Sequence, residues 1–136
     1  MRRMWGLLAV FLLAASAPAA AEELGINVEN FPDENFRKIV SDNYDRDKNG
    51  KLSTQEIAWA TSIEISDKPI QSLEGIKYFT ALYKLHYTRT NLTALDLSQN
   101  MNLYKLNCSG TKLTALDLSN NTELRELNCN ETRFIY

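Results

Sequence analysis

The sequence predicts an α+β fold in which a short helical head leads into a repeat solenoid with a parallel β-sheet. Residues 92–112 (LTALDLSQNMNLYKLNCSGTK) and 113–133 (LTALDLSNNTELRELNCNETR) repeat one another with a period of 21. A fixed period of this length is typical of stacked coils. Residues 31–60 instead place apolar side chains three to four positions apart, around a segment rich in Asp, Asn and Gly. That spacing is typical of helices.

The repeat has the apolar spacing of leucine-rich repeats. Leu85, Leu106 and Leu127 occupy one position of the repeat, and a looser copy begins at Ile63. Alternating apolar residues in each copy predict a short strand. One coil cannot bury its apolar face alone, so we expect about four coils stacked through one parallel sheet. The predicted strands are 63–66, 84–87, 105–108 and 126–129.

A second set of apolar residues recurs about half a period after the first. Leu95 and Leu97 restate the motif in one copy, and Leu116 and Leu118 restate it in the next. This nesting predicts extended segments on both sides of each coil. Little helix is expected after Ile63.

The head should consist of two short helices. Apolar side chains three to four positions apart run up to Tyr44, and Asp33 precedes them as a helix start signal. The chain then becomes polar, which ends the first helix. Residues 54–60 predict a second helix that packs through Ile57 and Trp59.

The segment between the two helices matches a calcium-binding loop. Residues 45–56, DRDKNGKLSTQE, fit the EF-hand pattern D-x-[DN]-x-[DN]-G-x₅-E without a mismatch. Gly50 permits the sharp turn of such a loop, and the oxygen-rich set of side chains suits Ca²⁺, the cofactor that the sequence predicts. The expected ligands are Asp45, Asp47, Asn49, the backbone carbonyl of Lys51, Ser53 directly or through water, and Glu56 as a bidentate carboxylate.

The alternative for this segment is a polar surface turn between two helices, and the complete match favours the metal site. Arg46, Lys48 and Lys51 should direct their side chains away from the ion. EF-hands usually work in pairs, so a single loop predicts a weak affinity of about 10⁻⁴–10⁻³ M. The ion would be structural, because it fixes the angle between two helices that cap the first coil.

Residues 1–21 have the layout of a secretory signal peptide. Two arginines precede an apolar run that ends at Ala15, and Ala19 to Ala21 offer a cleavage site before Glu22. The run is too short for a membrane anchor, which needs about 20 apolar residues. We therefore expect a secreted or cell-surface protein with no membrane span after signal removal. Its domains are the helical head, 22–61, and the leucine-rich repeats, 62–136.

The charge balance and the polar side chains favour binding over catalysis. Removing Arg2 and Arg3 with the signal takes the net charge from −2 to −4, which argues against nucleic acid as a partner. His86 is the only histidine and has no catalytic grouping around it. Asp96 and Asp117 recur with the repeat, so they are better explained as repeat positions than as an acid–base pair. We expect a monomer that is not an enzyme.

Two cysteines, Cys108 and Cys129, share one repeat position with Tyr87. Their side chains should point into the core, where cysteine behaves as a small apolar residue. We expect two buried free thiols, and a disulfide is the alternative in an exported chain.

The helix, calcium loop and short helix, followed by repeats of the form L-x-x-L-x-C-x-x-T-x-L-T-x-L-D-L-S-x-N, resemble bacterial secreted leucine-rich-repeat proteins of the internalin style. The resemblance covers residues 31–133. It implies an exported protein that binds a protein or cell-surface ligand. Members of that family usually carry more repeats or an anchoring module. The alternative is therefore the accessory head of a larger exported enzyme whose catalytic domain follows Tyr136.

The outward face of the main sheet is the expected partner site, because repeat proteins present such faces as extended binding surfaces. The alternative is a face that is merely solvated, since the predicted residues include no aromatic anchor. The predicted face consists of Lys84, His86, Thr88, Lys105, Asn107, Ser109, Glu126, Asn128 and Asn130.

Overall fold

A computed structural model describes residues 22–132 of the chain, and the predicted signal peptide lies outside the described residues. The head contains β1 (Leu24–Gly25), α1 (Glu34–Tyr44), β2 (Lys51–Leu52) and α2 (Thr54–Trp59). The repeats contain β3 (Ser62–Ser66), the 3₁₀ helix η2 (Ile76–Tyr78), β4 (Lys84–Thr88), β5 (Lys105–Asn107) and β6 (Glu126–Asn128).

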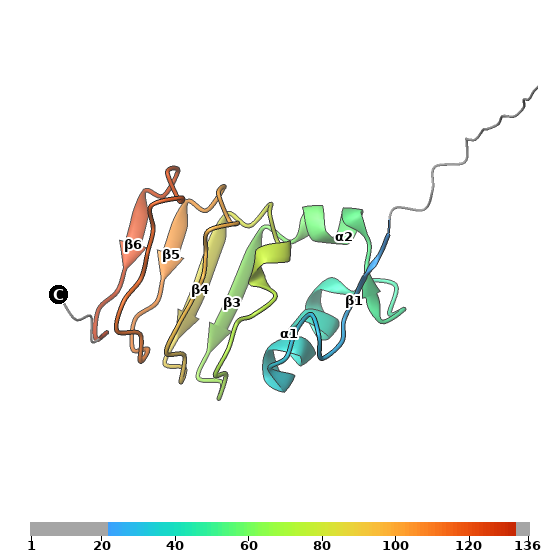
Figure 1. Cartoon of the computed structure of the whole chain (residues 1–136), viewed down its shortest axis with the longest axis horizontal. Helices are drawn as coiled ribbons and strands as arrows, with labels where there is room; N and C mark the ends of the chain where they lie inside the picture. The colour runs from blue at the N-terminus through green and yellow to red at the C-terminus, as the bar shows by residue number, and fades with distance from the viewer. Residues whose placement is uncertain (1–21, 133–136) are drawn as a thin grey trace, which may run out of the picture.

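Four strands of the repeats form one parallel sheet in the order β3-β4-β5-β6 (Figure 1). Ile63 pairs with Leu85, Leu85 with Leu106, and Leu106 with Leu127, so the register follows the period of the sequence. The parallel sheet and its four predicted strands are confirmed, with small differences at the strand ends. Alternation along β3 buries Ile63 and Ile65 and exposes their neighbours.

Among the described residues, the opposite side of the coils forms no second β-sheet. The segments at Leu95 and Leu116 form no strand in the part of the chain that the structure describes. Buried asparagine side chains join the coils there instead. The Asn100 amide nitrogen donates to the carbonyls of Ile76 (2.9 Å) and Phe79 (3.0 Å). These side chains take the place of a second backbone ladder, which the leucine spacing alone could not reveal.

The head packs directly against the first coil, and α1 lies beside β3 in Figure 1. Phe31 is fully buried at this junction, with its ring centroid 5.9 Å from that of Phe36 in α1 and 5.9 Å from that of Tyr78 in η2. Gly75 has φ +106°, and a Cβ atom there would lie 2.4 Å from the Phe31 ring. Glycine is therefore required at this position by both the backbone and the packing.

Polar bonds reinforce the same junction. The Asp33 carboxylate caps α1 by accepting from the backbone N–H groups of Asn35 and Phe36, each at 3.0 Å. Its second oxygen accepts from the backbone of the first coil, at Gln71 (2.8 Å) and Ser72 (3.2 Å). The Asp33 side chain thus caps the start of α1 and also binds the backbone of the repeats. Within residues 22–132, no helix has the length and apolar character needed to cross a membrane.

Candidate metal centre and outer sheet face

The candidate metal site lies in the loop between α1 and α2, and Asp45 begins it. This carboxylate is 2% exposed, and its two oxygens accept from the backbone N–H groups of Asn49 (3.1 Å) and Gly50 (2.9 Å). Gly50 has φ +82°, the left-handed conformation that glycine adopts without strain. The loop backbone therefore folds around the first predicted ligand.

Glu56 is fixed at the other end of the loop by a capping box. Ser53 caps α2 by accepting from the Glu56 backbone (3.1 Å), and one Glu56 carboxylate oxygen accepts from the Ser53 backbone (2.9 Å). The other Glu56 carboxylate oxygen accepts from the backbone N–H of Arg46. The Glu56 side chain therefore joins the two ends of the loop. These hydrogen bonds, led by that of Ser53, lower the pKa of Glu56 below its usual range.

Three carboxylates converge in the loop. Asp45, Asp47 and Glu56 each bring an oxygen within 4.8 Å of the others, and the first and last of them are buried. Partial desolvation, together with the charges of Glu56 and Asp45, raises the pKa of Asp47. A hard divalent cation would relieve this crowding of negative charge, since Ca²⁺ prefers carboxylate oxygens. The donor set therefore fits the ion that the sequence predicts.

The other three predicted ligands stand differently. The Asn49 side chain turns its amide nitrogen to Asp47 (3.2 Å), while its oxygen accepts from the Lys51 backbone (2.8 Å). Its oxygen would face a cation only after the amide turns over. The Ser53 hydroxyl donates to the Glu56 carboxylate (3.0 Å) and accepts from the Glu56 backbone N–H (3.1 Å), so in this structure it acts as the cap of α2. Lys51 lies in β2, where its backbone pairs with Gly25.

Two of the three cationic side chains in the loop, those of Lys48 and Arg46, make contacts away from the carboxylates. Lys48 donates to the backbone carbonyls of Ser41 (2.9 Å) and Asp42 (3.2 Å) in the last turn of α1, a favourable place for a cation. The Arg46 guanidinium lies 4.4 Å from the centre of the Trp59 ring. Trp59 is 49% exposed, so its prediction as a packing residue is wrong: its ring lies under Arg46 at the surface.

Sequence reasoning missed the strand that supports this loop. β1 pairs antiparallel with β2, with Leu24 opposite Leu52. The Ile26 backbone N–H donates to the Gly50 carbonyl at 3.0 Å. The strand is only two residues long, and the alternation of Leu24, Ile26 and Val28 was the signal that could have indicated it.

The outer sheet face holds most of the predicted partner residues together. A shallow groove of about 590 Å³ is lined by six of them: Lys84, His86, Lys105, Asn107, Glu126 and Asn128. Ser109 and Asn130 follow β5 and β6 and do not line it. Lys84 pairs with Glu64 (2.7 Å) and Lys105 with Glu126 (3.6 Å). Arg125, which also lines the groove, donates to the backbone carbonyls of Thr122 and Leu124.

Thr88 is a correction to the predicted face. It is 3% exposed and cannot offer its side chain to a partner. Its hydroxyl lies 3.1 Å from the Ser66 hydroxyl and 3.4 Å from the Nε2 atom of His86. Thr88 is the last residue of β4, and its polar neighbours on and beside the strand enclose it.

An aromatic pair precedes the strands and was not recognised from the sequence. Tyr83 and Tyr104 stack in parallel, with ring centroids 5.0 Å apart and an interplanar angle of 4°. Their backbones are in register, because the Tyr104 N–H donates to the Tyr83 carbonyl (2.8 Å) and the Arg125 N–H to that of Tyr104 (2.9 Å). Tyr83 is 46% exposed. The spacing of 21 between the two tyrosines was the signal that could have found them.

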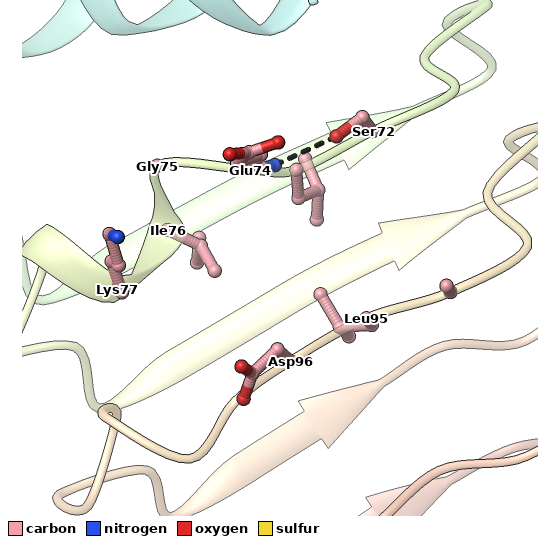
Figure 2. A pocket seen from close by; sticks show the side chains of 9 residues that line it. Ser72, Glu74, Gly75, Ile76, Lys77, Leu95 and Asp96 are labelled. Atoms are coloured by element: carbon pink, nitrogen blue, oxygen red, sulfur yellow. Dashed lines mark hydrogen bonds between the residues drawn. The ribbon is translucent and has the colours of Figure 1, made fainter. Parts of the chain in front are cut away.

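A second cavity, of about 420 Å³, lies between two neighbouring coils (Figure 2). Residues 72–77 form one wall and residues 94–96 the other. Asp96 accepts from the Ser98 backbone at 2.9 Å, and Asp117 accepts from the Ser119 backbone at the same distance. Hydrogen bonds from the Ser98 side chain and backbone lower the pKa of Asp96. Both aspartates thus make the same repeated turn, which supports their interpretation as repeat positions.

The repeat position shared by Tyr87, Cys108 and Cys129 faces the core, and burial is complete for the first two of these residues. Tyr87 and Cys108 are fully buried, whereas Cys129, in the last described coil, is half-buried. Both cysteines are free thiols in the structure. Burial raises the pKa of Cys108 to about 11, so this thiol stays protonated at neutral pH.

Comparison with known proteins places these features in context. No protein-family model matches the chain. Internalin J from two strains of Listeria monocytogenes is 39% identical to it over 70 residues, which make up 52% of this chain. The alignment spans only 8% of the length of these curated relatives.

Solved structures show the same relationship. The functional domain of internalin J from Listeria monocytogenes, described as including a cysteine ladder, superposes with a TM-score of 0.74 and 35% identity. That match covers 85% of this chain and 26% of the other. Internalin C2 from the same organism has a TM-score of 0.72 and 19% identity over 85% of this chain and 52% of its own, which shows a shared fold. By these likenesses, the described chain is an internalin-like leucine-rich-repeat protein.

Proposed function

We propose that this chain is an exported, calcium-binding leucine-rich-repeat protein that binds a protein or cell-surface ligand and catalyses no reaction. The observation that carries the calcium part is the convergence of Asp45, Asp47 and Glu56 within a complete EF-hand pattern. The likeness to internalin J supports the binding part. This chain covers only 26% of that solved domain, so its partner and its export are proposed here and are not taken over from internalin J.

The calcium ion would be structural. Asp45, Asp47 and Glu56 would hold it, joined by the Asn49 amide once that group has turned over, the Lys51 carbonyl and Ser53. Bound there, the ion would supply two positive charges that offset most of the −3 charge of the three carboxylates. Because Asp45 follows α1 and Glu56 lies in α2, this bridge would fix the angle between the two helices.

The helical head would in turn cap the repeats. Repeat arrays need an end that shields the core cross-section. The burial of Phe31 against η2 and the bonds from Asp33 to Gln71 and Ser72 support this role. Calcium would therefore stabilise the sheet through the head.

The outer sheet face would receive the partner. Its groove offers paired charges and the amides of Asn107 and Asn128. The stacked Tyr83 and Tyr104 precede the strands that line it and supply the aromatic side chains that are enriched at binding hot spots. The alternative of an enzyme's accessory module gains no support from the comparisons, since the relatives carry the name internalin.

Calcium titration of residues 22–136 by calorimetry tests the central part of this proposal. One site is expected in the wild type, and Glu56→Ala and Asp45→Ala should abolish the heat of binding. Asp96→Ala removes an equal charge from an exposed turn in the repeats and should leave binding unchanged. A wild-type protein with no measurable binding up to 10 mM, about ten times the weakest expected Kd, would contradict the proposal.

Export has its own test. Residues 1–21 fused to a reporter should deliver it outside the cytoplasm and yield a product that begins at Glu22. An uncleaved fusion that stays in the cytoplasm would contradict this part of the proposal.

A further inference from the structure

We propose that Glu23 belongs to the calcium site, and that the segment 23–26 is an N-terminal clasp whose docking on the loop is coupled to calcium binding. This inference rests on the proposed calcium function. It adds a residue outside the 12-residue loop pattern, and it gives the first residues of the predicted mature chain a role in metal affinity.

The position of Glu23 is fixed by backbone pairing. Leu24 and Gly25 pair with Leu52 and Lys51 in an antiparallel ladder. The Ile26 N–H donates to the carbonyl of Gly50. Without β1, the short strand β2 would present an unpaired edge beside the carboxylates. The clasp therefore closes the loop from a part of the sequence that lies more than twenty residues before it.

The side chain of Glu23 then reaches the loop. One of its carboxylate oxygens accepts from the Asn49 amide nitrogen at 3.1 Å. The same nitrogen lies 3.2 Å from a carboxylate oxygen of Asp47, so one amide bridges two carboxylates from separate segments. Glu23 is thereby held one side chain away from a predicted ligand. When the Asn49 amide turns over to face an ion, this bond is lost, but the pairing of Leu24 and Gly25 with β2 still keeps the Glu23 carboxylate beside the loop.

A fourth carboxylate changes the charge of the site. Asp45, Asp47 and Glu56 supply three negative charges, and Glu23 brings the total to four against the two positive charges of Ca²⁺. Affinity in such loops depends on the charge of the site and the rigidity of the loop. Glu23 adds a negative charge beside the ligands, and β1 adds rigidity. A single loop with this clasp should bind calcium more tightly than the loop alone.

Coupling between the clasp and the ion is reciprocal. If docking of residues 23–26 strengthens calcium binding, calcium must stabilise the docked segment by the same factor. The Ile26 amide reports this directly, because its hydrogen bond to Gly50 joins the clasp to the loop. Its hydrogen exchange should slow when calcium is added.

The test compares two single-charge variants of the protein starting at Glu22. Glu23→Gln keeps the shape of the side chain and removes its charge, and Glu22→Gln makes the same charge change at the adjacent exposed residue. By calorimetric titration with CaCl₂, we expect Kd to rise about threefold to tenfold in Glu23→Gln, as fits the loss of one negative charge beside the ligands. In Glu22→Gln it should change by less than about twofold, because Glu23 and not Glu22 is hydrogen-bonded to the loop in the described residues.

The outcomes separate this inference from the proposed function. A wild-type protein that binds no calcium would overturn both. Binding in the wild type with equal affinities for the two variants would overturn the role of Glu23 alone. Circular dichroism shows whether each variant folds. If Glu23→Gln fails to fold, Ile26 exchange in the wild type decides instead: slowing by calcium supports the clasp, and an unchanged rate overturns it.

Discussion

The helical head and the leucine-rich repeats are stabilised in different ways. In the repeats, equivalent residues make the same contact in successive coils: Ile63, Leu85 and Leu106 form one buried column, and Asn100 and Asn121 make equivalent bonds. In the head, contacts such as the capping box of Ser53 and Glu56 occur once. A repeated contact can be removed from one coil and remain in the others, whereas a contact of the head has no second copy.

The junction between the two regions combines both kinds of interaction. Phe31 belongs to the head but packs on Tyr78 and Phe79 of the first coil. Gly75 belongs to the coil, but the Phe31 ring of the head occupies the space that a side chain at this position would need. Substitutions at the junction should therefore have larger effects on stability than substitutions within the repeats.

The largest expected effect is that of Phe31→Ala. This change removes a fully buried ring that contacts three other aromatic rings, and it should lower the free energy of unfolding by about 3–5 kcal/mol. Urea denaturation followed by circular dichroism measures the loss. Val28→Ala, at a 58% exposed position of the same segment, is the control. A loss below about 1 kcal/mol would show that the head and the repeats are independent units.

Asn100→Ala tests the bonds between coils. The substitution removes two buried hydrogen bonds, although the Ile76 and Phe79 carbonyls keep the backbone N–H groups of Phe79 and Leu82 as donors. At about 0.5–1.5 kcal/mol for each bond, the loss should be about 1–3 kcal/mol. Asn102→Ala, which removes one exposed bond to Thr80, should change the free energy of unfolding by less than about 0.5 kcal/mol. Equal losses in the two variants would refute the role given to the buried asparagine.

Asp33→Ala should have a smaller effect, of about 1–2 kcal/mol, the usual cost of losing a helix N-cap. The loss should appear in both regions, because the carboxylate also binds the backbone at Gln71 and Ser72. Amide exchange at these two residues measures the second part. Faster exchange in α1 alone would show that Asp33 acts only as a cap.

The lowered pKa of Glu56 predicts how stability depends on pH in calcium-free buffer. Its hydrogen bonds favour the ionised carboxylate, so the contribution to stability is complete above the ordinary value of 4.5. It is lost as the pH falls through the lowered pKa of the folded state. Glu56→Gln should remove this part of the pH dependence of the urea midpoint. An unaltered acid limb in the variant would assign the dependence to other groups.

The smallest expected effect on stability is on the outer sheet face. Lys105→Ala removes a half-exposed side chain whose pair with Glu126 is 3.6 Å long, and the free energy of unfolding should change by less than about 0.5 kcal/mol. A purified partner, once in hand, should bind this variant more weakly. A loss of stability above 1 kcal/mol would mean that the face serves the fold.

The repeats were more predictable than the head for a physical reason. The alternation of apolar and polar residues around Ile63, Leu85 and Leu106 predicts which face of each strand is buried. The period of the repeat predicts which strands pair and in what register. The head has no period, so its fold depended on one local motif, residues 45–56. That motif predicted the convergence of the carboxylates.

Interactions between distant segments could not be read in the same way. The pairing of β1 with β2, the double role of Asp33 and the orientation of the Asn49 amide all depend on segments that meet only in the folded chain. Thr88 shows the same limit within a strand. Alternation assigned it to the outward face, but its bonds with neighbouring polar side chains bury it.

Hydrogen exchange of residues 22–136, in calcium and after chelation, tests most directly whether the head stabilises the repeats through its ion. Calcium at ten times its Kd should add about 1.4 kcal/mol to the folded state, which corresponds to roughly tenfold slower exchange of amides that open only by global unfolding. The account predicts this slowing in β3 and β4 as well as in the loop. Slowing confined to residues 45–56, with unchanged rates in Ser62–Ser66 and Lys84–Thr88, would contradict it.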